Sequence, residues 1–265
     1  MYIVGHLVIT EKSGVFAGDT LYGEGVLALM LPDYARCHDW GYERCFKTKN
    51  FTLKQLLIEA HMLGDWYVHY AEPSDTPKHM GWVYQRMRPY ARRYQRFFAE
   101  AARLGLRDDV PPRDSIRGFG HTMMEYSIDT FLVRRGDFDG RFEIIRSVLG
   151  RLGAIDSVGS KKWLSQTLEQ DGIPTQPAIL DREIGIYRER VLSCRDAEEF
   201  AFRAGVYKFG LKPGDQSVAF VKSFIDEGMQ EIPAAEISDV VDQAAAFVGT
   251  WLRQASVTGG EQLWT

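Results

Sequence analysis

The sequence predicts a mainly α fold, a multi-helix bundle that holds a metal cluster between helices of its N-terminal half. Apolar residues recur at helical rather than alternating spacing in most long segments, which favours helices over strands. All six histidines lie between His6 and His121 of a 265-residue chain, and two of them stand four residues before a carboxylate. Because a four-residue interval keeps side chains on one side of a helix, the expected metal site is carried by helices.

Four long helices are predicted in the first part of the chain. One covers Leu53 to Tyr70 with Thr52 as its cap, because apolar side chains recur along its whole length. Proline and glycine segments then separate three further helices, over about 81–104, 116–134 and 138–152. Pro89 is expected to kink or split the helix over 81–104, since proline removes a backbone donor.

The second half contains no histidine, and its predicted helices lie near 181–191, 197–204, 215–224 and 234–254. We therefore expect a metal-binding helical domain over residues 1–155 and a helical C-terminal region over 156–265 packed on it. A chain of this length can bury about three-quarters of its unfolded surface without help from a metal. A metal in the first half would then serve function more than stability.

Composition narrows the classes of partner. A net charge of −4 provides no positive surface for a dedicated nucleic-acid module. Three cysteines without CxxC spacing indicate reduced thiols and a cytoplasmic location. The N-terminal segment lacks the cationic start of a signal peptide, and no membrane span is predicted. A homo-oligomer is compatible with all of these features.

Two stripes of metal-binding side chains are predicted, one on each of two helices: His61, Asp65 and His69 on the first, and His121, Glu125 and Asp129 on the second. Imidazole and carboxylate groups bind zinc, manganese and iron, and the carboxylates offset the charge of the ion. Burial of the first stripe beside apolar residues would be costly without polar partners, which a metal supplies. We expect divalent metal ions, zinc first, with manganese or iron as alternatives.

Two further segments add ligand types, His6 in the apolar N-terminal run and Asp33 with His38 in a short polar stretch. Taken in chain order, these residues and the two stripes resemble the ligand series of the zinc-dependent phospholipase C and single-strand-specific nuclease superfamily. The resemblance lies in the ligand pattern alone and covers residues 1–135. It implies a helical enzyme that binds a zinc cluster and hydrolyses a phosphoester through a metal-activated water.

The resemblance also implies roles for individual residues. Asp65 of the His61–Asp65 pair would be the carboxylate that bridges metals, with His69 beside it as the second catalytic residue. Asp65 or a nearby carboxylate would hold the attacking water. His121 and Glu125 would complete the site of another metal, and His6, Asp33 and His38 would bind the remaining ion. The implied substrate is a small-molecule or lipid-like phosphoester.

Other side chains have both a functional and an ordinary interpretation. His79, Arg86 and Arg93 are candidates for substrate binding, although arginine runs are also typical of a solvated helix face. Aromatic residues near the first stripe could line a pocket, but Trp66 is assigned to the core. Asp129 could orient a ligand histidine.

Two other functions fit parts of the same pattern. In a diiron oxidase of helical-bundle type, Glu125, Asp129 and the stripe that begins at His61 would bind iron. In a non-catalytic helical binding protein, the histidines would be ordinary hydrogen-bonded core residues. The first would bind iron, and the second would bind no stoichiometric metal.

Overall fold

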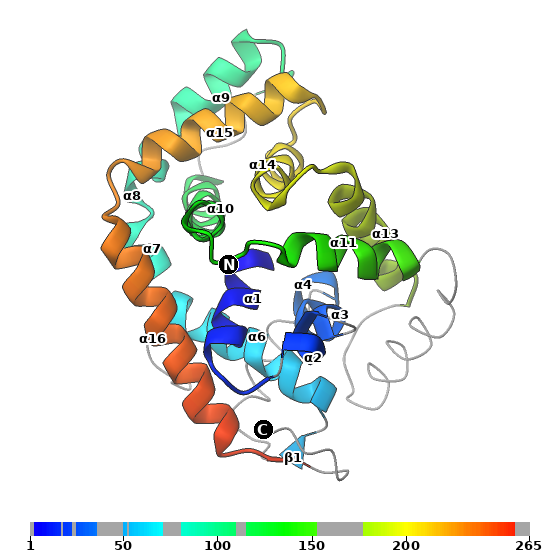
Figure 1. Cartoon of the computed structure of the whole chain (residues 1–265). Coiled ribbons are helices and arrows are strands. Elements are labelled where there is room, and N and C mark those ends of the chain that lie inside the picture. The colour runs from blue at the N-terminus through cyan, green and yellow to red at the C-terminus, as the bar shows by residue number, and fades with distance from the viewer. Residues whose placement is uncertain are drawn as a thin grey trace. The chain divides into compact units, whose positions relative to one another are not determined.

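A computed structural model describes residues 3–16, 18–22, 25–35, 50–51, 53–70, 81–109, 115–152 and 177–257. Helices make up most of these residues, so the predicted mainly α fold is confirmed (Figure 1). Within the described ranges, strand structure is limited to a parallel pair of two-residue strands, β1 (Asn50–Phe51) and β2 (Ser256–Val257).

The chain divides by its internal contacts into two units, each assembled from three segments. The first unit comprises Met1–Gly5, Asp65–Phe138 and Arg195–Gln243, and the second comprises His6–Gly64, Asp139–Cys194 and Ala244–Thr265. Two long helices, α6 (Leu53–Tyr70) and α16 (Ala234–Arg253), pass from one unit to the other. The domain boundary predicted at residue 155 lies outside the described residues.

Helix α10 (Ile116–Arg135) is the centre of the first unit. It packs against α7 (Trp82–Arg86), α8 (Arg88–Ala91), α14 (Ala197–Lys208) and α15 (Asp215–Met229), and Figure 1 shows it beside the last two. The core is aromatic: the ring centroid of Phe97 lies 4.9–5.2 Å from those of Phe98, Phe119, Phe209, Phe220 and Phe224. Tilted and edge-to-face rings at this spacing interact favourably beyond the area that they bury.

The single helix predicted over 81–104 is instead three helices, α7, α8 and α9 (Tyr94–Arg103). Pro89 lies in the first turn of α8. Backbone N–H groups in the first turn have no partner within the helix, so the missing N–H of a proline there costs nothing. In a continuous helix the proline ring would clash with the carbonyl four residues earlier. The split that Pro89 predicted is therefore confirmed, and the chain turns again at Arg92 and Arg93.

The second unit contains most of α1 (Ile3–Lys12) together with α2 (Gly18–Tyr22), α3 (Gly25–Leu29), α4 (Leu31–Ala35), α11 (Arg141–Leu152) and α13 (Pro177–Ser193). Helix α13 packs on α11 and α4, and α11 also packs on α2. Helix α3 is buried on all sides. Spacing alone does not predict α1, because apolar residues occupy most of its length and distinguish no single face.

The start of α1 is held by the side chain of Asp129, from α10. One carboxylate oxygen accepts a hydrogen bond from the backbone N–H of Val4 at 3.0 Å, and the other accepts from Gly5 at 2.8 Å. Both donors belong to the first turn of a helix, where backbone N–H groups have no partner within the helix. Burial raises the pKa of Asp129 to about 7, although these two donors favour the ionised form. Asp129 therefore acts as a helix cap supplied from a distant part of the chain.

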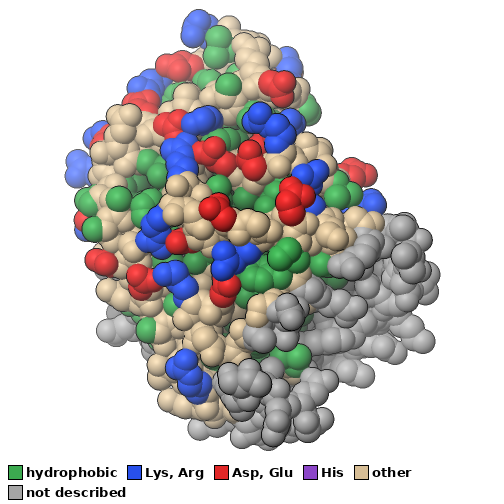
Figure 2. Space-filling view, viewed as in Figure 1, with side chains coloured by type: hydrophobic (Ala, Val, Ile, Leu, Met, Phe, Trp, Pro, Cys, Tyr) green, Lys and Arg blue, Asp and Glu red, His purple; other side chains and the backbone are tan. Residues whose placement is uncertain are grey.

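Charged side chains of both signs are mixed on the surface. On the face drawn in Figure 2, Lys and Arg side chains lie among Asp and Glu side chains. Within the described residues, no helix is both long enough and apolar enough to cross a membrane.

Candidate metal centre

Three predicted ligands of the first unit converge on one point. His69, near the end of α6, has its Nε2 atom 2.8 Å from Nε2 of His121 on α10. Oε1 of Glu125, one helical turn after His121, lies 3.2 Å from each of these nitrogens. The His69 side chain is 6% exposed, Glu125 15% and His121 24%, so the point of convergence is open to solvent mainly through His121.

The protonation of His69 follows from its second ring nitrogen. Nδ1 lies 2.9 Å from the backbone carbonyl oxygen of Asp65, which can only accept a hydrogen bond. Nδ1 must therefore carry the proton and donate it. In the neutral ring this leaves a lone pair on Nε2, directed at His121 and Glu125. A histidine that binds a metal is commonly held by such a bond from its other nitrogen to a carbonyl group.

The charge state of this triad also suits a cation. Burial lowers the pKa of His69, and the nearby carboxylates of Asp65 and Glu125 offset only part of that effect. Burial acts to raise the pKa of Glu125, but the imidazoles of His121 and His69 outweigh it and hold that pKa well below its ordinary value. A neutral imidazole and an ionised carboxylate are the forms that bind a metal.

The distances fit the size of a divalent ion. Bonds from zinc to nitrogen or oxygen ligands of about 2.0–2.1 Å at tetrahedral angles place neighbouring ligand atoms roughly 3.3 Å apart. The separations of 2.8, 3.2 and 3.2 Å come close to this value, and only the distance between the two histidines needs to widen. The residues of this triad therefore fit a metal ion.

Asp65 lies on the opposite side of the His69 ring from the triad. Its Oδ1 atom is 3.5 Å from Nδ1 of His69, and the residue is buried. In this position Asp65 helps to orient the imidazole. Its predicted role as a carboxylate that bridges metals stays a prediction.

Helix α7 closes one side of the triad. The ring of Tyr84 stacks on His121, with centroids 5.1 Å apart and planes inclined by 8°. The guanidinium carbon of Arg117, four residues before His121 on α10, lies 4.6 Å from the centroid of the Tyr84 ring. The start of α7 touches the end of α6, because Gly81 donates a hydrogen bond to the carbonyl of His69 at 2.8 Å.

Three predicted ligands of the second unit form another group. His6 of α1, Asp33 of α4 and His61 of α6 each offer one ligand atom, and these atoms all lie within 4.8 Å of one another. The two imidazole rings are stacked, with centroids 3.7 Å apart, and both histidines are buried. This group could also hold a metal ion if its ligand atoms approach one another to roughly 3.3 Å.

Each triad lies within one unit, so the single cluster implied by the resemblance stays a prediction. Two predicted residues, the ligand His38 and the substrate-binding candidate His79, lie outside the described residues. Asp129 bonds to the backbone of α1 through both carboxylate oxygens, and its predicted roles in orienting a ligand histidine or binding iron stay predictions.

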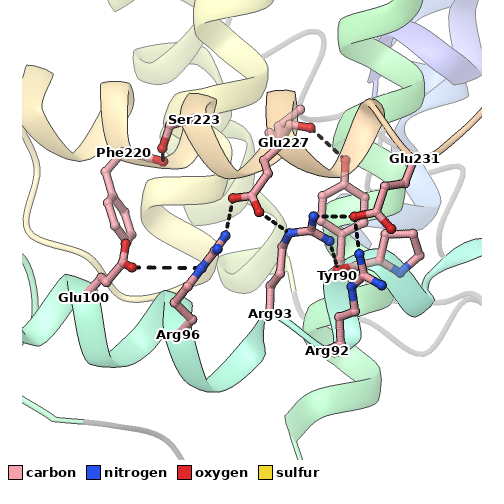
Figure 3. Close-up of polar contacts among 11 residues, drawn as sticks. Tyr90, Arg92, Arg93, Arg96, Glu100, Phe220, Ser223, Glu227 and Glu231 are labelled. Atoms are coloured by element: carbon pink, nitrogen blue, oxygen red, sulfur yellow. Dashed lines mark hydrogen bonds and ion pairs between the residues drawn. The ribbon is translucent and has the colours of Figure 1, made fainter.

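The two arginines proposed for substrate binding take part in ion pairs. Nε of Arg86 donates to Glu236 at 2.6 Å. Arg93 is buried and donates to Glu227 at 2.9 Å and to Glu231, as Figure 3 shows. The Arg86 pair joins α7 to α16, and the Arg93 pairs join the turn between α8 and α9 to α15 and to the turn that follows it. We therefore leave both arginines out of the proposed site.

The aromatic residues near the first stripe divide between core and surface. Trp66 is 3% exposed, which confirms its assignment to the core. Tyr67 and Trp82 line an open groove of about 470 Å³ between α6, α7 and α16. The Tyr67 hydroxyl donates to the side chain of Gln243 in this groove at 2.9 Å.

Arg117 is the neighbour of the triad that sequence reasoning missed. It continues the stripe of His121 and Glu125 by one turn toward the start of α10, and that spacing could have identified it.

Comparisons with protein-family models, with curated proteins and with solved structures found no match. The resemblance to the phospholipase C and nuclease superfamily therefore stays a prediction.

Proposed function

We propose that the protein is a metal-dependent hydrolase that acts on a phosphoester. The observation that carries the proposal is the convergence of His69, His121 and Glu125 at ligand distances, with one ligand partly open to solvent. A second group in the same chain, with two buried histidines and a carboxylate, further supports metal binding.

A bound divalent ion would supply a Lewis acid for the phosphoryl oxygen and would activate a water molecule at neutral pH. His69 and His121 would hold the ion through Nε2, and Glu125 would neutralise one of its charges. Asp65 and the carbonyl bond to Nδ1 keep the His69 ring in the required orientation. Only three protein ligands converge here within the described residues, a ligand number that is typical of catalytic rather than structural zinc sites.

One carboxylate of the site can help to orient a water molecule. Glu125 is held ionised and lies against both imidazoles, so it can accept a hydrogen bond at the open side of the site, whereas its lowered pKa makes it a weak proton acceptor. The Tyr84 ring, stacked on His121, limits the freedom of that imidazole and shields it from water on one face.

The first experiment is elemental analysis of protein purified without added metal and without a histidine tag. We expect at least one equivalent of zinc, manganese or iron in the wild-type protein. Glu125→Gln keeps the shape of the side chain and removes its charge, so it should bind the metal at least tenfold more weakly. Glu100→Gln is the matched control, because Glu100 lies on α9 outside the triad and should leave metal content unchanged.

Hydrolysis is then measured on a phosphomonoester and a phosphodiester, p-nitrophenyl phosphate and its bis ester. We expect turnover that a chelator abolishes and that Glu125→Gln reduces at least a hundredfold, while Glu100→Gln retains it. Bound iron with oxygen consumption and no ester hydrolysis would favour the oxidase instead. If the protein takes up none of the three metals, the proposal is refuted and the non-catalytic helical binding protein is favoured.

Two alanine variants separate the two groups of ligands. His61→Ala should remove metal from the group of His6 and Asp33, and His121→Ala should remove metal from the other triad. Loss of a different equivalent in each variant would show two occupied sites. A loss confined to His121→Ala would show that the second unit's histidines are not metal ligands.

A further inference from the structure

Among the residues that the structure describes, Arg117 differs from most arginines of the first unit because it has no ion-pair partner. Within the described part of the chain, no carboxylate lies at ion-pair distance from its guanidinium group, whereas Arg86, Arg93 and Arg134 each pair with a glutamate. Its recorded contact is with the face of the Tyr84 ring. The side chain is exposed, so its five N–H donors can reach a ligand.

Tyr84 positions this cation next to the metal-binding triad. The guanidinium carbon of Arg117 lies 4.6 Å from the centroid of the Tyr84 ring. The centroid of the His121 imidazole lies 5.1 Å from the same point. Arg117 and His121 are also four residues apart on α10, which places their side chains on the same face about 6 Å apart at Cβ. A group bound at the open side of the triad would therefore lie within reach of Arg117.

The charges of the site favour an anion at this position. A divalent ion with one carboxylate and two neutral imidazoles leaves one net positive charge, and Arg117 adds a second nearby. Without a ligand these charges repel each other, and an anion between them removes that repulsion. Guanidinium groups bind phosphoryl oxygens through two parallel hydrogen bonds, and contact with an aromatic face restricts the side chain before the ligand arrives.

We infer that Arg117 binds the non-bridging phosphoryl oxygens of the substrate, with Tyr84 holding its guanidinium group beside the triad. The inference rests on the proposed function, because it assigns a residue that recognises the phosphoryl group to the same metal site. Arg117 is then a substrate-binding residue and not a metal ligand.

The test is binding of inorganic phosphate to metal-loaded protein, measured by isothermal titration calorimetry. Arg117→Ala should weaken phosphate binding about tenfold to a hundredfold, as expected for loss of charge-assisted hydrogen bonds, with metal content unchanged. Arg117→Lys keeps the positive charge but loses the planar pair of donors, so its affinity for phosphate should lie between those of the wild type and Arg117→Ala. Arg103→Ala removes an exposed arginine of α9 and should bind phosphate as the wild type does.

The thermal stability and metal affinity of Arg117→Ala distinguish a role in binding from a structural role. If Arg117 only supports Tyr84, Arg117→Ala would lower thermal stability or metal affinity and leave phosphate affinity unchanged, which overturns the inference. Metal-loaded wild-type protein that binds no phosphate also overturns it. Phosphate binding that depends on Arg117, in protein that hydrolyses no phosphoester, would uphold the anion site and refute the hydrolase.

Discussion

Gly228→Ala is expected to destabilise the first unit, because the added methyl group has no space. Gly228 lies near the end of α15, and a Cβ atom there would lie 1.9 Å from Cε1 and 2.2 Å from Cζ of Tyr90. Ordinary contacts between carbon atoms are about 3.5–4.0 Å, so ring and helix must separate by roughly 1.5 Å or more. Tyr90 is fully buried and cannot turn aside.

The hydroxyl group explains why the ring is held. It donates to the carbonyl of Ile225 at 3.0 Å and also bonds to the hydroxyl of Ser127. Overpacking costs about 1–3 kcal/mol, and a buried polar group that loses its partner costs about 1–3 kcal/mol more. Replacing glycine by alanine in a helix returns up to about 1 kcal/mol. We therefore expect a net loss of about 1–6 kcal/mol in the free energy of unfolding.

The assay is urea unfolding of metal-free protein, followed by circular dichroism. Gly118→Ala in α10 is the control, since a Cβ atom there would meet nothing within 4 Å, and it should change stability by less than about 1 kcal/mol. In a Tyr90→Leu background, Gly228→Ala should cost at least about 1 kcal/mol less than in the wild type. A loss of stability that is the same in both backgrounds would refute the steric argument.

Three further predictions concern the site and its supports. Gly81→Ala places a Cβ atom 2.3 Å from the carbonyl carbon of His69, and because the backbone cannot yield there, α7 must shift together with Tyr84. We expect metal binding at least severalfold weaker in a chelator competition. An unchanged metal affinity would contradict this expectation. Since burial raises the folded-state pKa of Asp129 to about 7 from its ordinary 3.8, the folded chain holds that proton more tightly, and stability should fall by up to about 4 kcal/mol as pH rises between these values. Urea unfolding of metal-free protein should show a flatter pH dependence for Asp129→Asn, and equal slopes would argue against the raised pKa. Arg93→Ala should lower stability by about 1–3 kcal/mol and leave phosphate binding intact, because its guanidinium group already serves two glutamates; weaker phosphate binding would restore it as a substrate-binding residue.

Local patterns in the sequence predict much of the helical structure. The helix predicted from Leu53 to Tyr70 has those limits in the structure, and the one predicted over 116–134 ends one residue later, where Gly136 adopts a positive φ of 87°. Periodic apolar residues and a glycine suited to the left-handed conformation are local signals, so these elements can be recognised without a tertiary context. The short helices before residue 36 carry no comparable signal, because they are buried on several sides.

The residue types of the candidate site were also predictable, but their grouping was not. His61 and His69 belong to one stripe in the sequence, yet His61 lies with His6 and Asp33, and His69 lies with His121 and Glu125. Eight residues turn a helix roughly 80° beyond two full turns, so the two histidines can meet different neighbours. Which helix supplies those neighbours depends on packing between segments far apart in the chain.

The sequence by itself determined the helical fold, the concentration of histidines in the first half and the four-residue spacing of the ligands, because these depend on local geometry. Tertiary structure alone decided that Asp129 caps α1 and that Arg93 pairs with Glu227 and Glu231, more than 100 residues away. It also decided that Tyr84 joins Arg117 to His121. A charged side chain is chemically able to serve as ligand, cap or ion-pair partner, and the nearest group in the folded chain selects among these uses.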